Sequence, residues 1–513
     1  MYRPLLRRCL ATVLSVTALT AAVGVATPAS AAPPPRLADH LVRHVSVNNI
    51  NRHLVAFQRI AHQNDGNRAA GTSGYDASAE YVYNLLQRAG YHVSYQEFPF
   101  VYEEVLENEL HQTAPVARTF NPIPMTYSGS APEGGLHAPL SVLPVDATPG
   151  CEAEDFQDGS YAGTVVLIFR GSCTFAQKAI NAEAAGAVGV LIYNNDADLN
   201  APLNGTLGEP NLVSIPVAGL TRGEGETLAA DAQSDSVTVH FGLRILQEER
   251  TTRNVIAQTR TGRTDNVVML GAHLDGVQDG PGINDNGSGS AALLEIALQL
   301  ANQRPRNAVR FAFWGAEENG LLGSEYYVSQ LSFEEQLDIA LYLNFDMIGS
   351  PNYVRFIYDG DDSDGVGAGP GPYGSAQIED VFEDYFDRRS LAYEGTDFTG
   401  RSDYGPFIEV GIPSGGLFTG AEERKTAEQA AIYGGTAGEA FDPCYHQACD
   451  NLGNVNRTVL DQMADAAAWA TGVFATDTSA VNGSTWAQQQ RERAARAALS
   501  ARASVSDPHH PVI

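Results

Sequence analysis

The chain has 513 residues, which is longer than one ordinary domain, so we expect two or three domains. Hydrophobic residues make up 43% of the sequence and charged residues 18%; a sizeable core can therefore form, and a disordered chain is excluded. The formal net charge of −29 gives an acidic surface that repels nucleic acid and anionic membranes, and neither is expected as a partner.

Residues 1–31 have the pattern of an export signal. Three arginines precede an apolar run over residues 10–26, and Ala29-Ser30-Ala31 matches the small-residue cleavage pattern. A membrane anchor is the alternative, but the run is shorter than the ~20 residues that span a bilayer, and prolines at 33–35 follow it. We therefore predict cleavage after residue 31 and a secreted, extracellular mature protein.

Two helices and a strand are expected before residue 106. Apolar residues at helical spacing predict a helix over 50–61 and a second over 75–89, which Gly90 ends. A strand over 91–98 follows. These elements lack a core of their own, so we assign them to the domain that resumes after residue 245.

The segment 106–245 differs in character from the rest of the chain. It is rich in proline, glycine and short β-type runs, which predict an inserted domain that combines strands with a helix. The expected strands are residues 165–169, 189–193 and 214–219, and the expected helix is 175–185.

The cysteines agree with export. Cys9 lies in the predicted signal, which leaves Cys151, Cys173, Cys444 and Cys449. An even set in an exported protein indicates disulfides, and we expect Cys151–Cys173 and Cys444–Cys449 because each pair falls within one local unit. A single metal site of four thiolates is the alternative, but the pairs lack C-x-x-C spacing.

After residue 253 apolar strands alternate with helices. This alternation predicts an α/β domain with a mixed, largely parallel sheet flanked by helices on both faces. The expected strands are 254–259, 267–272, 309–314 and 339–345, and the expected helices are 288–301 and 321–331.

The predicted main domain is thus residues 46–105 plus 246–476. Residues 477–513 are expected to be a disordered or processed tail, with an amphipathic partner-binding helix as the alternative.

Residues of the types that bind metal ions follow three of these predicted strands. His273, the pair Glu317 and Glu318, and Asp346 each come just after an apolar strand, and the carboxyl ends of parallel strands share one edge of a sheet. Two more candidates lie in loops: Asp285 in a turn before a helix, and His446 between Cys444 and Cys449. Each residue alone could be a turn, a cap or a solvated edge, but the set is hard to explain without a shared site.

Two imidazoles and three carboxylates suit two zinc ions, with manganese and cobalt as alternatives. We expect Asp285 to bridge the ions, with His273 and Asp346 on one ion and Glu318 and His446 on the other. Ions ~3.5–4 Å apart can share a hydroxide. Single residues nearby receive the remaining roles. Glu317 is the predicted general base, Tyr445 the donor to the developing oxyanion, and Asp275 the partner of the second nitrogen of His273.

The motifs around these residues resemble a known family. The segments that carry the resemblance read GAHLDGV, GINDNGSGSAALLE, FAFWGAEENGLLGS, LNFDMIGSPN, GRSDYGPF and FDPCYHQACD. They are similar to the bacterial secreted two-zinc leucyl aminopeptidases over residues 46–105 and 246–476. The resemblance implies the same five ligands, Glu317 as base, Tyr445 as the carbonyl-polarising residue, and Arg401 as a contact of the substrate's carbonyl or carboxylate side.

The resemblance implies three further features. Residues 160–192 resemble the protease-associated domain, which accompanies secreted peptidases. Some relatives bind a structural Ca²⁺, to which Asp461 and Asp465 would contribute, although the region around His44 lacks the acidic residue that completes that site. A preference for leucine or another large apolar residue at the N-terminus of a peptide substrate is also implied.

Several functions compete for this chain. We expect a monomeric aminopeptidase that acts on peptides. The nearest alternative is a carboxypeptidase of the same superfamily, which needs a basic cluster around the substrate carboxylate. A glutaminyl cyclase needs fewer ligands, and a binding module or transport receptor would have lost some of them. A serine or thermolysin-type hydrolase is disfavoured because neither G-x-S-x-G nor H-E-x-x-H occurs.

Overall fold

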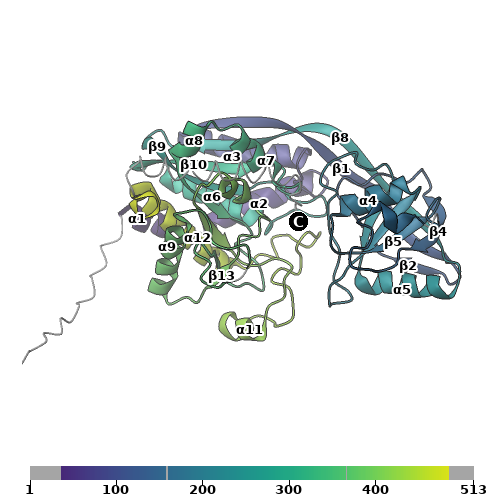
Figure 1. Cartoon of the computed structure of the whole chain (residues 1–513). Coiled ribbons are helices and arrows are strands. Elements are labelled where there is room, and N and C mark those ends of the chain that lie inside the picture. The colour runs from purple at the N-terminus through teal and green to yellow at the C-terminus, as the bar shows by residue number, and fades with distance from the viewer. Residues whose placement is uncertain (1–35, 158–159, 366, 484–513) are drawn as a thin grey trace, which may run out of the picture. The chain divides into compact units, whose positions relative to one another are not determined.

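The structure is a computed structural model that describes residues 36–157, 160–365 and 367–483 (Figure 1). The predicted signal over 1–31 and residues 484–513 of the predicted tail lie outside the described residues. Within the described part, no helix combines the length and apolar character needed to cross a bilayer.

The main domain is built on a mixed sheet that is parallel at its centre, as the sequence predicts. Strand β9 pairs in parallel with β10 and β11, and β11 pairs in parallel with β14. Antiparallel neighbours are β8 beside β10, and β12 beside β14. The strands are β8 (Thr238–Gln258), β9 (Arg263–His273), β10 (Asn307–Trp314), β11 (Ile339–Phe345), β12 (Phe356–Tyr358), β13 (Glu394–Thr396) and β14 (Ser414–Phe418).

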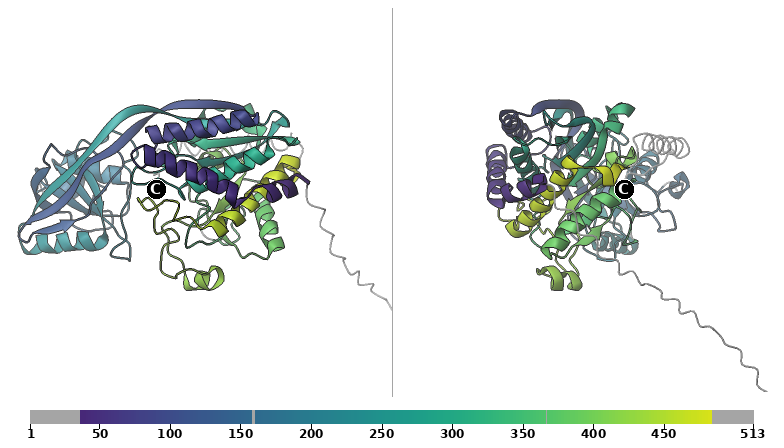
Figure 2. Two further views of the ribbon diagram at one scale, coloured as in Figure 1. Left: turned by 180° about the vertical axis from the view of Figure 1, so that it is seen from behind. Right: turned by 90° about the vertical axis from the view of Figure 1, so that its left-hand side faces the viewer.

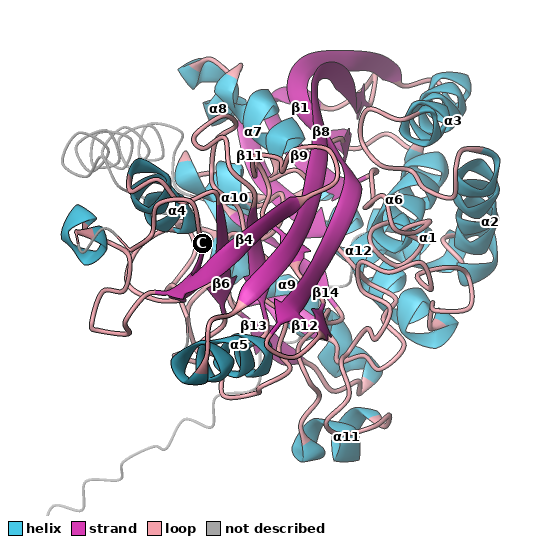
Figure 3. Ribbon diagram, turned by 90° about the vertical axis from the view of Figure 1, so that its right-hand side faces the viewer, coloured by secondary structure: helices cyan, strands magenta, loops and turns pink. Residues whose placement is uncertain are grey.

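Helices cover both faces of this sheet (Figure 3). Successive side chains of a strand point to opposite faces, so Val268 and Leu270 of β9 join the larger core while Met269 joins a smaller one. Helices α1, α2, α3, α6, α9 and α12 contribute to the larger core, and α7 and α10 to the smaller. The helices are α1 (Arg36–His44), α2 (Val47–Gln63), α3 (Ser73–Ala89), α6 (Gly287–Leu300), α7 (Leu322–Ser329), α8 (Phe333–Asp338), α9 (Ser375–Arg389), α10 (Gly405–Glu409), α11 (Ala427–Tyr433), α12 (Arg457–Thr476) and α13 (Ser479–Asn482).

The predicted insertion contains a run of parallel strands that continues the same sheet, because β4 pairs antiparallel with β8. Strands β4, β5, β6 and β7 pair in parallel in that order. Val165 and Leu167 of β5 join one core with α5, and Val166 and Ile168 join another with α4. The elements are β1 (His92–Ala114), β2 (Arg118–Phe120), β3 (Ile123–Pro124), β4 (Leu136–Val142), the 3₁₀ turn η1 (Ala153–Phe156), β5 (Val165–Phe169), α4 (Phe175–Ala184), β6 (Gly189–Tyr193), β7 (Val217–Leu220) and α5 (Arg222–Ser234).

Two long strands connect the two regions. β1 and β8 pair antiparallel from His92–Gln258 at one end to Ala114–Thr238 at the other. Both strands are much longer than the predicted 91–98 and 254–259, and they cross the predicted domain boundaries at 105/106 and 245/246. The exact boundaries remain a prediction.

Ordered structure also extends beyond both ends of the predicted main domain. Helix α1 lies before residue 46 and beside α12, as the purple and yellow helices in Figure 2 show. It buries Ala38 and Leu41 in the larger core. At the other end, the sequence predicts that residues 477–483 belong to the tail, but they contain helix α13. Val481 is fully buried and the amide of Asn482 donates to Asn266. Structure therefore continues to at least residue 483.

Both expected cysteine pairs are disulfides in the structure. Cys151–Cys173 has a Cα–Cα distance of 5.8 Å and joins the loop before η1 to the loop before α4. Cys444–Cys449 has a Cα–Cα distance of 5.3 Å and closes the loop that carries His446.

Candidate active site

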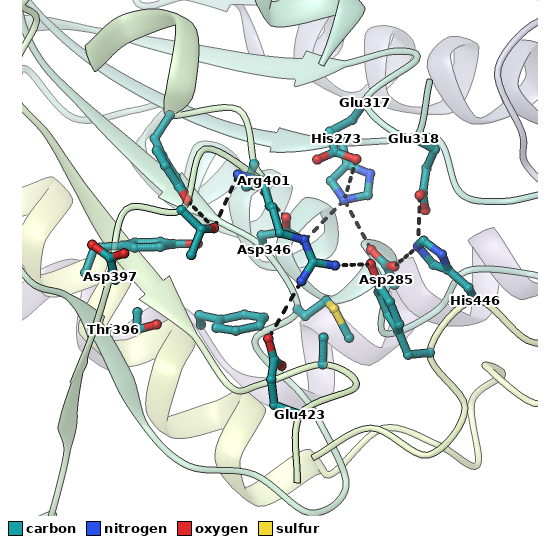
Figure 4. Close-up of a pocket in the computed structure, with 18 residues that line it drawn as sticks. His273, Asp285, Glu317, Glu318, Asp346, Thr396, Asp397, Arg401, Glu423 and His446 are labelled. Atoms are coloured by element: carbon teal, nitrogen blue, oxygen red, sulfur yellow. Dashed lines mark hydrogen bonds and ion pairs between the residues drawn. The ribbon is translucent and has the colours of Figure 1, made fainter. Parts of the chain in front are cut away.

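The candidate metal ligands gather at the carboxyl edge of the central strands. His273 is the last residue of β9, Asp346 directly follows β11, and Glu317 and Glu318 follow β10. Since β9, β10 and β11 run parallel, their ends meet at one edge. Asp285 reaches the same edge from the turn before α6, in which the Asp285–Asn286 peptide bond is cis. Figure 4 shows these side chains pointing toward one another.

The carboxylate of Asp285 lies between the two histidines. Its Oδ1 is 3.2 Å from Nε2 of His273, and its Oδ2 is 3.2 Å from Nε2 of His446. On one side, Asp346 Oδ1 is 3.2 Å from Nε2 of His273. On the other, Glu318 Oε2 is 2.9 Å from Nε2 of His446. The five residues thus form two half-sites that share one carboxylate.

The electrostatics of this cluster favour a cation. Burial alone would lower the pKa of His446, but the carboxylates of Glu318 and Asp285 raise it to about 11. The Oε1 atom of Glu318 is buried and has no hydrogen-bond partner among the described residues. Buried carboxylates crowded together repel one another, and imidazole and carboxylate are both good zinc ligands. The donor set therefore fits divalent metal ions.

Glu317 lies beside the cluster without taking part in either pair of ligands. Its Oε2 is 4.0 Å from Nε2 of His273, and its side chain is buried and lines the pocket. The preceding residue, Ala316, has a positive φ of 58°, a conformation that side chains rarely adopt. This turn directs two consecutive glutamates into one site.

Asp275 positions the glutamate turn. Its carboxylate accepts hydrogen bonds from the backbone N–H groups of Glu317 and Glu318, each at 3.3 Å. The predicted contact with His273 is looser, because Nδ1 of His273 is 3.8 Å from the Asp275 carboxylate but 3.2 Å from its backbone carbonyl. Asp275 thus connects the ends of β9 and β10, and orienting His273 remains a prediction.

The turn that carries Asp285 is held by Asp450, a residue that sequence reasoning missed. The Asp450 carboxylate accepts from the backbone N–H of Asn284 at 2.9 Å and of Asp285 at 3.0 Å. Asp450 is buried and directly follows Cys449 in the quoted motif FDPCYHQACD, but its contact with a turn more than 160 residues away leaves no local pattern in the sequence.

Two further missed residues lie in the quoted motif GRSDYGPF. The hydroxyl of Ser402 donates to Oδ2 of Asp346 at 2.6 Å, which orients that carboxylate. Asp403 is fully buried, and burial raises the pKa of its carboxyl to about 8. The sequence predicts a role for Arg401 alone in this motif, although a hydroxyl and an acid follow it directly at 402 and 403.

Arg401 and Tyr445 lie at the mouth of the site. An Nη2 of Arg401 donates to the hydroxyl of Tyr445 at 3.4 Å, and Nη1 is 2.8 Å from Glu422 and 3.7 Å from Glu423. The Tyr445 ring stacks on the His446 ring with centroids 3.8 Å apart. The guanidinium is therefore already paired with two carboxylates.

The cluster forms the floor of a pocket with a volume of about 640 Å³, open mouth included. Beside the candidate ligands the wall combines apolar and aromatic side chains with polar ones such as Asp397 and Glu423, and Arg401 is the one arginine or lysine among the described lining residues. The apolar and aromatic lining residues are Met347, Tyr358, Tyr404, Phe418, Ala421 and Tyr445. Such a pocket suits a positively charged group attached to an apolar side chain.

The two acids considered for calcium have protein partners. Asp461 accepts the backbone N–H of Val47 at 3.1 Å, and Asp465 accepts the hydroxyl of Tyr385 at 3.4 Å. Among the described residues, the groups of acids and histidines close enough to hold an ion do not include this pair. Calcium binding remains a prediction.

Comparison with known proteins agrees with this geometry. The sequence model of peptidase family M28 matches residues 254–471, and that of the PA domain matches residues 136–228. Among solved structures, the aminopeptidase of Aneurinibacillus sp. strain AM-1 has a TM-score of 0.68 and 26% identity, with 85% of this chain and 95% of that chain covered. A zinc aminopeptidase of Bacillus subtilis has a TM-score of 0.59 and 28% identity, with 86% and 95% covered.

Curated relatives match over most of the chain. An aminopeptidase of Pseudomonas aeruginosa is 48% identical over 455 residues, which cover 86% of this chain and 83% of the relative. Leucine aminopeptidase 2 of Arthroderma otae is 40% identical over 441 residues, which cover 85% of this chain and 86% of the relative. At this identity and coverage, the chain belongs to peptidase family M28 and carries a PA domain inserted in its peptidase domain.

Proposed function

We propose that this protein is a secreted aminopeptidase that holds two zinc ions and removes N-terminal residues, preferably leucine or another large apolar residue, from peptides. The proposal rests on the family membership, on the pocket, and on the names of the similar proteins, which include aminopeptidase, leucine aminopeptidase and zinc aminopeptidase.

The observation that carries the proposal is an acidic floor beside a group of apolar and aromatic side chains. The α-ammonium group at a peptide's N-terminus can pair with Glu317 and Asp346, which both line the pocket. The first side chain of the peptide then lies against the apolar lining, including Met347 and Phe418. A blocked N-terminus loses the charge that this floor recognises, so the first peptide bond alone is placed for attack.

Five residues would hold the ions. His273 and Asp346 would bind one zinc, Glu318 and His446 the other, and Asp285 both, in keeping with the two oxygens of Asp285 that face the two imidazoles. When bound, two zinc ions polarise the scissile carbonyl and make a water molecule acidic enough to attack it.

The remaining chemistry belongs to side chains of the chain itself. Glu317 would accept the proton of the attacking water and return it to the leaving amine. Tyr445 would donate a hydrogen bond to the carbonyl oxygen that becomes negative. The hydroxyl of Tyr445 accepts a hydrogen bond of 3.4 Å from Nη2 of Arg401, which positions it. Ser402 fixes the orientation of Asp346.

The carboxypeptidase alternative lacks support from the geometry. It requires free basic groups for the substrate's carboxylate, whereas Arg401 is paired with Glu422 and Glu423. Export is supported by the signal-like pattern of residues 1–31 and by two disulfides, which persist in oxidising compartments.

The test is to assay the purified mature protein on leucyl peptides and on the same peptides with an acetylated N-terminus. We expect hydrolysis of the free peptides, none of the acetylated ones, two zinc ions per chain, and loss of activity with a chelator that zinc restores. Cleavage of acetylated peptides, or release of residues from the C-terminus, would reject the proposal.

A further inference from the structure

We propose that the protein has a second kind of metal site, for one divalent transition-metal ion such as Zn²⁺ or Ni²⁺, on the outer face of the sheet where β1, β8 and β4 meet. The ligands would be His111, His240 and His137, with Glu109 as a fourth donor. This site is separate from the peptidase centre and does not depend on the proposed function.

The three histidines stand in one row across three neighbouring strands. His111 of β1 is directly opposite His240 of β8, and His240 is directly opposite His137 of β4. Directly opposed residues of antiparallel strands project to the same face with Cβ atoms about 4.5–5.5 Å apart. The pairing register therefore places three imidazoles side by side.

The row lies on the outer face of the sheet. The flanking residues Leu110, Val239, Phe241 and Ala138 belong to the buried core on the opposite face. The side chain of His111 is 39% exposed and His137 is exposed, whereas that of His240, in the middle, is 15% exposed. The two outer rings are thus accessible to solvent, and the central one lies between them.

The rings and the acid already lie close to one another. The ring of His240 is 4.4 Å from that of His137 and 6.0 Å from that of His111, measured between centroids. Glu109 Oε2 is 3.3 Å from Nε2 of His111 and 3.9 Å from Nε2 of His240. The rings of His111 and His240 are stacked, and the ring of His137 is tilted against that of His240. These four residues are not among the groups of described residues that already lie close enough to hold an ion. Coordination therefore requires the exposed His111 and His137 to turn about their side-chain bonds, which are free to change rotamer at a surface.

The central histidine has an unused ring nitrogen. Nδ1 of His240 is buried and has no hydrogen-bond partner among the described residues. A buried polar atom without a partner costs free energy, and a ligand bound at Nδ1 would remove that cost, while Nε2 of the same ring faces Glu109. The absent side chain of Gly135 leaves room for the ring, because a Cβ there would lie 2.4 Å from Cε1 of His240. Imidazole with one carboxylate is a donor set that zinc and nickel accept, and that calcium and magnesium disfavour.

The experiment is equilibrium dialysis of the full mature chain against micromolar Zn²⁺, with bound zinc counted per chain. We expect one ion more than the peptidase centre holds, and loss of that ion in His240→Gln and in His137→Gln. The same loss should appear in an Asp285→Asn background, in which the peptidase centre is disrupted, so the two proposals are tested apart. In the Asp285→Asn background, added Ni²⁺ should raise the melting temperature of the chain that keeps all three histidines but not of the chain that also carries His240→Gln or His137→Gln.

The matched control is His92→Gln, an exposed histidine on β1 outside the row. It should bind as many ions as the wild type.

Removal of one histidine should weaken binding at least about tenfold. Because ligand imidazoles must be deprotonated, the extra ion should also be released as the pH falls. The proposal fails if His137→Gln, at an exposed position where misfolding is not expected, keeps the extra ion, or if the wild type never binds it.

Discussion

At the scale of single residues, the five candidate metal ligands lie in contact with one another, whereas Glu317 lies farther from them. Asp285, His273, His446, Asp346 and Glu318 pair at 2.9 to 3.2 Å, whereas Glu317 approaches no closer than 4.0 Å to His273. A proton carrier must be close to the metal ligands without being consumed as one. Glu317 meets this requirement through its place beside Glu318 in the turn after β10.

We expect Glu317→Gln to keep both zinc ions but to lower kcat about 100-fold or more, because the amide cannot accept the proton of the attacking water. The measurement is kcat on a leucyl peptide together with zinc content. Glu334→Gln, an exposed glutamate of α8, should match the wild type. Near-normal kcat in the Glu317 variant would show that another group carries the proton.

A second prediction concerns Glu379 of α9, which lies outside the pocket lining. Burial raises the pKa of Glu379 to about 7, against the opposing hydrogen bond from the N–H of Gly360 at 2.7 Å. An unfolded glutamate titrates near about 4.3, so between these pH values the folded chain holds the proton more tightly than the unfolded chain. The contribution of Glu379 to stability is thus present at low pH and is lost as the pH rises through about 7.

We therefore expect Glu379→Gln to be more stable than the wild type at about pH 8, with a difference that shrinks toward about pH 5. Urea unfolding of both proteins at the two pH values measures this. An equal difference at both values would indicate a change in packing instead of a change in protonation.

At the scale of elements, one side chain connects the segment before α3 to the catalytic loops. Arg68 is fully buried, and its guanidinium donates to the carbonyls of Leu274, Pro281 and Gly282. Burial lowers its pKa to about 10, while Asp275 and Asp450 raise it, so the group keeps its charge at neutral pH. The loop after α2 thereby supports the loop that follows His273 and the turn that carries Asp285.

We expect Arg68→Met to reduce the free energy of unfolding by about 3 kcal/mol or more, because three buried carbonyls lose their donor. Arg59→Met, at an exposed position of α2, should change it by less than about 0.5 kcal/mol. Urea denaturation of the two variants measures the difference. Similar losses in both would mean that the buried contacts of Arg68 contribute little.

The elements also show where sequence patterns suffice. The strands predicted over 165–169, 189–193 and 339–345 have those bounds in the structure, because each is a short apolar run with both faces buried. β1 and β8 were predicted far too short. Their middle parts carry charged residues on exposed faces, and there β1 and β8 pair with each other, whereas the ends of β8 also pair with β4 and β10.

At the scale of the whole molecule, the metal centre should contribute to stability. The ligands come from five separate segments of the chain, and ions that bind the folded state alone stabilise it by mass action, by about 2.7 kcal/mol at a hundredfold excess over Kd. Without the ions, the clustered carboxylates of Asp285, Glu318 and Asp346 repel one another.

We expect a chelator to lower the melting temperature, and zinc to restore it. Calorimetry of the wild type with and without chelator measures this shift. Glu317→Gln should show the same dependence on zinc although it is inactive, which separates stability from turnover. A melting temperature that the chelator does not change would contradict the placement of metal ions among these residues.

Length, composition and apolar periodicity by themselves determined the α/β class, the insertion, the cysteine pairs and the strand ends that present His273, Glu318 and Asp346, because these depend on local patterns and on the direction of parallel strands. Tertiary structure alone decided that Asp450 and Arg68 support the catalytic loops and that His111, His137 and His240 form one row. Those relations depend on the register between strands and on contacts between residues far apart in sequence, for which no local pattern exists.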